Sequence, residues 1–193
     1  MNDSAGYNVI LLAAGNSARM GMDKALLPAG NGLSFAGNLA GKYREAGAGK
    51  ILLLVNHRLD QSKLLPGNIE TVVNHQPELG RGWSVQLGLR NLPEGSCCFI
   101  HNIDNPFLET GLVISLLAAC ESGNYVSPVY GGRGGHPVLI GPEIADHIRE
   151  MDHTPDFREI LSQFPVTEVP YSDPGILWNI NTPEEYAKYL AKL

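Results

Sequence analysis

The chain has 193 residues, enough for one domain with a sizeable core and slightly short for two independent ones. Hydrophobic residues make up 44% of the sequence and charged residues 18%, a balance that excludes a disordered or fibrous chain. The formal net charge is -6 and no run of Lys or Arg occurs, so we expect no nucleic-acid partner. A few well-placed cations can still bind a single nucleotide.

The N-terminal region predicts a cytoplasmic protein without a membrane partner. Residues 1–4 contain no basic stretch, and the apolar run at 9–14 is too short for a signal or transmembrane segment. The sequence has three cysteines, Cys97, Cys98 and Cys120. The number is odd, and the two adjacent cysteines would point to opposite faces of a strand. We therefore expect buried free thiols rather than a disulfide or a zinc site.

Apolar runs rich in β-branched and aliphatic residues alternate with segments of helical length. The predicted strands are 7–14, 51–55, 69–73, 97–103 and 125–129, and the predicted helices are 35–46, 83–91, 107–119 and 142–151. Nearly continuous apolar strands that alternate with helices are typical of a mostly parallel sheet covered on both faces. The sequence thus predicts one doubly wound α/β domain over residues 1–193, with three layers in the order α/β/α.

Two local signals refine this picture. Near the C-terminus, Thr182 can cap a helix, Pro183 suits its first position and Glu185 can complete a capping box. Upstream, residues 131–135 are Gly-Gly-Arg-Gly-Gly and precede a short apolar piece at 137–140. We interpret that stretch as a hairpin at an edge of the sheet.

The strongest chemical signal follows the first predicted strand, in residues 12–28. Small residues and Gly15 let the backbone approach a phosphate chain or a base, and its N–H groups can donate to anionic oxygens. Arg19 and Lys24 add the positive charge that a triphosphate needs, more so as charge develops on departing pyrophosphate. The loop is neither a Walker loop nor a dinucleotide fingerprint, because Lys24 precedes no Ser or Thr and the glycines lack the required spacing.

A carboxylate follows the apolar strand predicted at 97–103. Asp104 should therefore lie at the carboxyl edge of the sheet, where open α/β folds bind their ligands. Mg²⁺ takes one or two protein oxygens and completes its octahedron with waters and phosphate oxygens, so a single carboxylate at this edge suits it. The alternative is that Asp104 merely caps the next helix.

These features resemble the signature of the MobA-like NTP transferases, which include the guanylyl- and cytidylyltransferases that attach a nucleotide to molybdopterin. The resemblance continues in Asn56 and Asn74, each after a predicted strand, and in the segments 80–89, 103–106, 135–138 and 179–183. It implies a Rossmann-like sheet, similar to the nucleotide-diphospho-sugar transferases. It also implies transfer of NMP from CTP or GTP to a phosphorylated acceptor, molybdopterin or the molybdenum cofactor, with Mg²⁺ present and pyrophosphate released. A molybdoenzyme or its chaperone is the implied recipient.

The resemblance also implies roles for individual residues. The implied nucleotide-binding residues are Leu12, Ala13, Ala14, Gly15, Lys24, Asn56, Asn74 and Ser84; the catalytic ones are Arg19, Lys24 and Asp104; the metal ligands are Asp104 and Asn181. Many relatives have Asp at the position of Asn181. An amide oxygen can ligate Mg²⁺ without supplying charge, so we expect weaker metal binding that depends on the bound triphosphate. Asn179 could share that role.

No general base is expected, because a phosphate nucleophile is already ionised at neutral pH. The histidines are accordingly expected to be structural or solvated rather than paired at metal-ligand spacing: His57, His75, His101, His136 and His153. The resemblance places His136 at the floor of the second-substrate pocket. Trp83 either stacks on a ring or packs in a helix. Arg158 could reach a substrate phosphate.

Three alternatives are open at this stage. The acceptor could be a sugar or polyol phosphate, because the same loop serves related families. The Leu-Ala-Ala-Gly and Gly-His-Pro-Val segments look closer to the cytidylyltransferase branch, although a purine would still fit. A nucleotide-binding regulator without turnover is a second possibility, motivated by the neutral Asn181. A nicotinamide oxidoreductase would need the missing glycine fingerprint.

Overall fold

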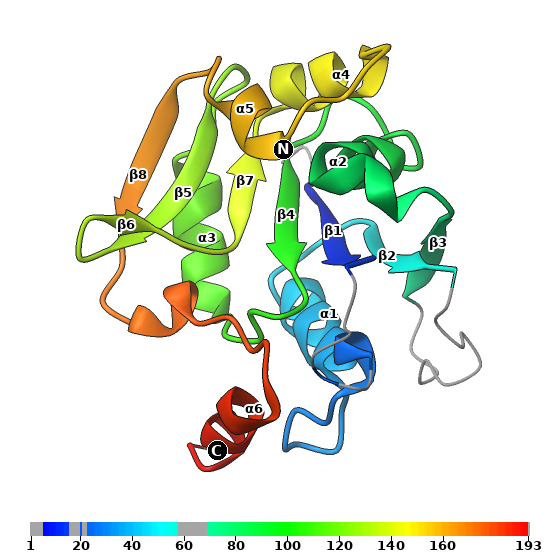
Figure 1. Ribbon diagram of the computed structural model, residues 1–193. Coiled ribbons are helices and arrows are strands. Elements are labelled where there is room, and N and C mark those ends of the chain that lie inside the picture. Colours follow the sequence, from blue (N-terminus) through cyan, green and yellow to red (C-terminus); the bar gives the residue numbers. More distant parts are fainter. Residues whose placement is uncertain (1–5, 16–19, 21–22, 58–68, 193) are drawn as a thin grey trace.

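The computed structural model describes residues 6–15, 20, 23–57 and 69–192. In that part of the chain one mixed sheet has the order β3-β2-β1-β4-β7-β5, and β8 pairs with the other side of β5 (Figure 1). The strands are β1 (Asn8–Ala13), β2 (Ile51–Asn56), β3 (Glu70–Asn74), β4 (Cys98–Asn102), β5 (Tyr125–Tyr130), β6 (Arg133–Gly134), β7 (Val138–Ile140) and β8 (Val166–Pro170).

The sheet divides into two regions by strand direction. Strands β3, β2, β1 and β4 are mutually parallel, so their carboxyl ends share one edge. Strand β7 runs antiparallel to both β4 and β5, while β8 runs parallel to β5. Since β7 is antiparallel to β4, the chain enters β7 at the edge where β4 ends. The start of β7 and the end of β4 can therefore contribute to one site.

Helices cover both faces of the sheet. One face packs against α1 (Phe35–Glu45) and α3 (Thr110–Ala118), and the other against α2 (Gly80–Leu89), α4 (Pro142–Glu150) and α5 (Phe157–Leu161). The C-terminal helix α6 (Pro183–Leu190) adds Tyr189 to the first of these cores. Short 3-10 turns are η1 (Lys24–Leu26), η3 (Pro77–Leu79) and η4 (Pro174–Leu177). This is the three-layer, mostly parallel α/β architecture that the sequence predicts.

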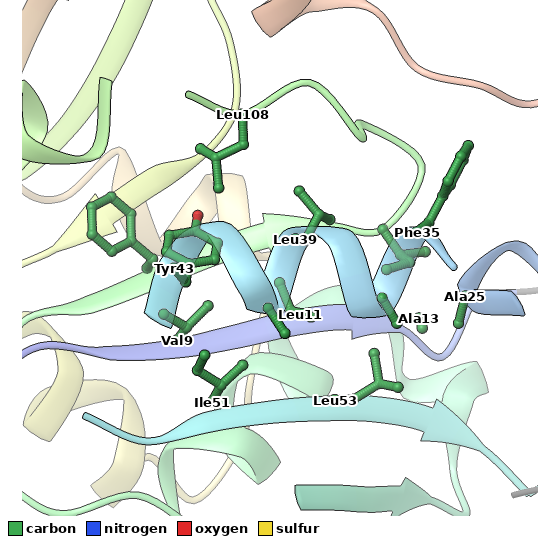
Figure 2. Packing of buried hydrophobic residues seen from close by; sticks show 14 of the residues in the cluster. Val9, Leu11, Ala13, Ala25, Phe35, Leu39, Tyr43, Ile51, Leu53 and Leu108 are labelled. Carbon is green, nitrogen blue, oxygen red and sulfur yellow. The ribbon is translucent and has the colours of Figure 1, made fainter. Parts of the chain in front are cut away.

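The alternation of side chains along the central strands explains the two cores. Val9 and Leu11 of β1 face the core on the α1 side, whereas Ile10 between them faces the α2 side. All three are fully buried. Figure 2 shows α1 lying over β1, and Leu39 and Tyr43 of this helix belong to the same buried cluster as Val9 and Leu11. A strand buried on both faces has to be apolar at every position, which is why these runs stand out in the sequence.

The predicted capping box of the C-terminal helix is confirmed, whereas two of the predicted helix boundaries are wrong. Thr182 and Glu185 form a complete capping box at α6. The helix predicted at 83–91 begins earlier, at Gly80, because η3 leads directly into α2. The helix predicted at 107–119 begins later, at Thr110. The prediction missed α5 and β8, since the first has five residues and the second alternates between exposed and half-buried positions.

The predicted edge hairpin is correct as a hairpin and wrong in its place. Gly131 and Gly132 have positive φ angles of 57° and 76° and turn the chain from β5 into β6. The apolar piece that follows, β7, lies between β4 and β5 rather than at an edge. Strand β8, which comes later in the chain, covers the other side of β5. Among the described residues, no helix has the length and apolar character needed to cross a membrane.

Candidate active site

The carboxyl ends of the parallel strands border a cleft of about 350 Å³. Its walls include Ala13, Ala14 and Gly15 after β1, together with Lys24, Asp104 and Asn181. The chain therefore brings residues from three distant segments to the edge where open α/β sheets bind ligands. The sequence predicted this edge and most of these residues.

Lys24 is the centre of the charged part of the cleft. It opens η1, and the side chain of Asp23 caps that turn by accepting a hydrogen bond from the Ala25 N–H. The Lys24 Nζ donates to Asn181 Oδ1 at 2.7 Å and lies 3.4 Å from Asp104 Oδ2. Its side chain is only 13% exposed. The ammonium thus sits between the two oxygen donors that the sequence assigned to a metal.

Asn105 holds the segment that carries Asn181 in place. Its side chain is fully buried, and Nδ2 donates to the carbonyls of Gly175, Ile176 and Trp178 at 2.9–3.2 Å. The Ile180 N–H also donates to the Asp104 carbonyl at 2.7 Å. These bonds fasten the 175–180 segment to the end of β4. Asn105 lies in the 103–106 segment that resembles the family signature, but the sequence by itself predicted no role for it.

The donor set around Lys24 fits a divalent cation that is shared with a ligand. Asp104 Oδ1 is buried and has no hydrogen-bond partner among the described residues, while its Oδ2 and the Asn181 Oδ1 both face the Lys24 ammonium. Such an orphaned carboxylate oxygen is costly unless a ligand or water completes it. Among the described residues, no group of three or more His, Cys, Asp or Glu side chains is arranged so that it could hold a metal ion by itself. Two oxygens are what Mg²⁺ takes when phosphates and waters supply the rest.

The backbone after β1 forms the opposite wall. Leu12 to Gly15 line the cleft, and Asn56 Nδ2 donates to the Gly15 carbonyl at 3.4 Å. Asn56 was expected to bind the nucleoside, and this bond shows that it also supports the loop that would do so. Arg19, expected on the phosphates, lies outside the described residues.

Asn74 has a different position from the one expected. It is fully buried, its Nδ2 donates to Ser84 Oγ at 3.1 Å, and its Oδ1 accepts from Trp83 Nε1 at 3.2 Å and from the Gln76 N–H. Both polar atoms are therefore used within the protein, and Asn74 does not line the cleft. It joins β3 to the first turns of α2, where Ser84 does face the cleft. Trp83 holds Asn74 rather than presenting its N–H to a ligand.

A second cavity of about 500 Å³ lies over the mixed half of the sheet and shares one residue with the cleft. That residue is Arg81, in the first turn of α2, which lines both hollows. His136 and Arg158 line the second cavity with it. The Arg81 guanidinium lies 5.2 Å from the centre of the Phe157 ring, and its Nε is buried without a partner among the described residues. Burial lowers the pKa of Arg81, while Asp104 and Asp156 act to raise it.

His136 lines the second cavity and has a ring nitrogen that is left without a partner among the described residues. Asn102 Nδ2 contacts His136 Nε2 at 3.0 Å, and an amide N–H can only donate, so Nε2 accepts and Nδ1 carries the proton. Nδ1 is buried and has no partner in the described part of the chain. Burial, reinforced by the charge of Arg81, lowers the pKa of His136 to about 3. The ring is therefore neutral at physiological pH and can donate one hydrogen bond to an anionic oxygen.

The other histidines are closer together than the sequence suggested. His57 and His75 follow the adjacent strands β2 and β3, and their rings lie nearly parallel with centroids 6.4 Å apart. His101 packs in the same way against His136, with a centroid distance of 6.3 Å. His101 itself is structural: it bonds to the Tyr43 hydroxyl and the Asn105 carbonyl at 2.9 Å, and burial lowers its pKa to about 4.

The sequence reasoning found the cleft residues but not Arg81 and Asn102. The helix was predicted to begin at residue 83, which left Arg81 outside it. Its placement between two cavities depends on the early start of α2 and on the packing of Phe157 from α5. Asn179, suggested as a second amide ligand, is exposed and does not line the cleft. Arg158 is exposed as well but does reach the second cavity.

Comparison with known proteins decides the family. Residues 9–168 match the MobA-like NTP transferase domain, and this region includes β1 from Val9 onward, β4 and the residues that line the second cavity. The chain belongs to the MobA-like NTP transferase family. A probable molybdenum cofactor guanylyltransferase from Rhodopirellula baltica is 29% identical over 113 residues, which cover 57% of this chain and 54% of that protein. The match thus spans about half the length of this curated relative.

Solved structures support the fold of this family member. A nucleotidyl transferase from Methanothermobacter thermautotrophicus has a TM-score of 0.79 and 18% identity, with 97% of this chain and 99% of that one covered. A manganese complex of Rv0371c from Mycobacterium tuberculosis has a TM-score of 0.77 and 16% identity, with coverage of 97% and 100%. At these identities the likeness concerns the fold.

Proposed function

We propose that this protein is a nucleotidyltransferase that moves an NMP group from an NTP to a phosphorylated small molecule and releases pyrophosphate. The observation that carries the proposal is the convergence of Lys24, Asp104 and Asn181 beside the backbone of residues 12–15. A lysine ammonium, a buried carboxylate oxygen without a hydrogen-bond partner among the described residues and a glycine-containing backbone segment along the cleft are the features that a triphosphate and its divalent ion require. Membership of the MobA-like NTP transferase family supports the same activity.

The protein needs mainly to position the two reactants and to neutralise their negative charge. The acceptor phosphate is ionised at neutral pH and attacks the α-phosphorus in line with the departing pyrophosphate, so no general base is needed. When bound, Mg²⁺ would neutralise phosphate charge, with Asp104 and Asn181 as its protein ligands. Lys24 would then pair with phosphate oxygens instead of these two side chains. An ammonium on a flexible stem is suited to that exchange of partners.

The second cavity is our candidate for the acceptor. Arg81 lines both hollows, so it can contact an acceptor phosphate and lies next to the cleft proposed for the triphosphate. The neutral His136 adds a hydrogen-bond donor and Arg158 adds a charge at the rim. We propose molybdopterin or the molybdenum cofactor as the acceptor and CTP or GTP as the donor, on the family resemblance and the guanylyltransferase relative. A molybdoenzyme or its chaperone would receive the product.

Binding and turnover can be measured separately. The first experiment is a thermal-shift series with ATP, GTP, CTP and UTP, each with and without Mg²⁺ or Mn²⁺. A triphosphate at about one hundred times its Kd stabilises the folded state by about 2.7 kcal/mol, which corresponds to a rise in Tm of roughly 5–10 °C. We expect CTP or GTP to give the largest rise and the divalent ion to increase it. Equal shifts for NTP with and without metal would contradict the proposed metal site.

The second experiment measures pyrophosphate release with a panel of acceptors: molybdopterin, a hexose phosphate and a polyol phosphate. Release with molybdopterin supports the proposal as stated. Release only with a sugar or polyol phosphate keeps the nucleotidyltransferase and changes the acceptor. Binding of an NTP without turnover on any acceptor favours the regulator, for which the neutral Asn181 is the motivating observation.

The acceptor cavity has its own test. Arg81→Met removes the charge and keeps much of the side-chain volume, so we expect the KM for the acceptor to rise at least tenfold, as expected for a lost charged hydrogen bond. The KM for the NTP should change less. Arg133→Gln, an exposed arginine in the β6 hairpin that lines neither hollow, is the matched control. An unchanged acceptor KM in Arg81→Met would remove Arg81 from the acceptor site.

A further inference from the structure

All three cysteines are free, as the sequence predicts, but the fold brings two of them together and leaves those two only half-buried. Cys97 directly precedes β4, and Cys120 follows the C-cap of α3. Their Sγ atoms are 2.9 Å apart, although 23 positions separate them in the chain. Both are reduced and both are half-buried, so a small reagent in solution can reach them. Adjacent Cys98 faces the other core and is 1% exposed.

The environments of these thiols differ in a way that matters for reactivity. The Cys97 and Cys120 sulfurs share a hydrogen bond, and this bond lowers the pKa of Cys97. The same bond and burial raise the pKa of Cys120. Burial alone accounts for most of the raised pKa of Cys98. Because the thiolate is the nucleophile, Cys97 is the first of the three to react.

We propose that Cys97 and Cys120 form a reversible intramolecular disulfide when the protein meets a hydroperoxide. The Cys97 thiolate attacks one peroxide oxygen, the O–O bond breaks, and a sulfenic acid and hydroxide form. The Cys120 sulfur then attacks the Cys97 sulfur, loses its proton and displaces the sulfenic oxygen as water. In total, two thiols lose two hydrogens and one hydrogen peroxide becomes two waters. A dithiol reductant reverses the bond by exchange.

The position of the bond indicates what it would do. It would close a loop from residue 97 to residue 120 that contains all of β4, Asp104 and α3. The link lies where the chain enters β4, at the opposite end of that strand from Asp104. Cross-linking should therefore stabilise the folded chain while leaving the proposed active site in place. A loop of this length predicts a rise in Tm of roughly 5–12 °C on the chain-entropy account.

The test treats the purified full chain with hydrogen peroxide and follows three readouts. Thiol titration should fall from three accessible groups in denaturant to one, peptide mapping should find Cys97 linked to Cys120, and Tm should rise and return after dithiothreitol. Cys97→Ser and Cys120→Ser should each abolish the Tm rise, while Cys98→Ala should keep it. Activity of reduced Cys97→Ser should equal that of the reduced parent.

Each readout can contradict the proposal. Three thiols remaining after oxidation, a bond that includes Cys98, or a link that forms only between chains would overturn it. A Tm rise that persists in Cys97→Ser would show that another oxidation is responsible. If Cys98→Ala does not fold, peptide mapping of the parent still identifies the bonded pair.

Discussion

The parallel and mixed halves of the sheet build their cavities in different ways. In the parallel half, the cleft is lined by residues that directly follow strands, such as Gly15 after β1 and Asp104 after β4. In the mixed half, the second cavity combines the first turn of α2, the turn before β7 and the region of α5. Arg81 joins the two. The strand-end cleft follows from local sequence order, whereas the second cavity depends on how separate elements pack.

The largest expected effect concerns the parallel half. Lys24→Ala and Asp104→Asn each remove a charge proposed to act on the triphosphate, so we expect kcat to fall by roughly 10²-fold or more, about 2.7 kcal/mol. Steady-state pyrophosphate release measures it. Lys50→Ala is the control, because Lys50 forms a surface ion pair with Glu70 at the amino ends of β2 and β3, and neither residue lines the cleft. Full activity in both site variants would place the chemistry elsewhere.

Adding one methyl group at Gly82 should disrupt the junction between the parallel and mixed halves of the sheet. A Cβ added at Gly82 in α2 would lie 2.0 Å from the Pro155 carbonyl oxygen, which precedes α5. Gly82→Ala should therefore destabilise the protein by about 1–3 kcal/mol and weaken acceptor binding more than NTP binding. Gly41→Ala in α1, where a Cβ would meet nothing within 4 Å, should be neutral or slightly stabilising. Urea unfolding compares them, and equal stability of the two variants would refute this account of the junction.

Low pH should lower the free energy of unfolding, because two histidines with lowered pKa values lie where the parallel and mixed halves of the sheet meet. His101 and His136 have pKa values near 4 and 3 in the folded state, against 6.5 for an ordinary histidine, because burial disfavours their charged form. Below pH 6.5 these two histidines bind protons in the unfolded chain but remain neutral in the folded chain. Each histidine therefore costs about 1.4 kcal/mol of stability per pH unit as pH falls from 6.5 toward its folded pKa.

Unfolding in urea between pH 7 and pH 4 measures this loss. His136→Gln should reduce the slope by about 1.4 kcal/mol per pH unit. His153→Gln, which makes the same substitution at an exposed histidine, is the matched control. A His136→Gln slope equal to that of the parent would show that His136 is protonated without cost in the folded state.

The smallest expected effect concerns the affinity of the proposed site for a divalent metal. Asn181→Asp adds a charge next to Asp104 and Lys24, so we expect Mn²⁺ or Mg²⁺ to bind roughly tenfold more tightly in the absence of NTP. Isothermal titration calorimetry with the metal alone measures this affinity. Asn179→Asp, exposed and outside the cleft, should bind metal like the parent. Equal affinities for all three proteins would argue that Asn181 is not a ligand.

Local patterns were sufficient for the fold class and for half of the site. Continuous apolar strands indicated a sheet covered on both faces, and the end of such a strand was sufficient to predict Asp104 at the ligand edge. Short or amphipathic pieces, β7, β8 and α5, have no such pattern, because their positions depend on pairing with strands already formed. The error in placing β7 at an edge has that cause.

By itself, the sequence determined the α/β class, the loop with Lys24 and the carboxylate after β4, because each depends on neighbours a few residues apart. Only the tertiary structure decided that Lys24 contacts Asn181 across 157 positions, that Arg81 lines two hollows, and that Cys97 meets Cys120. Contacts of that kind arise when distant segments pack against one sheet. No residue's immediate neighbours in the chain encode them.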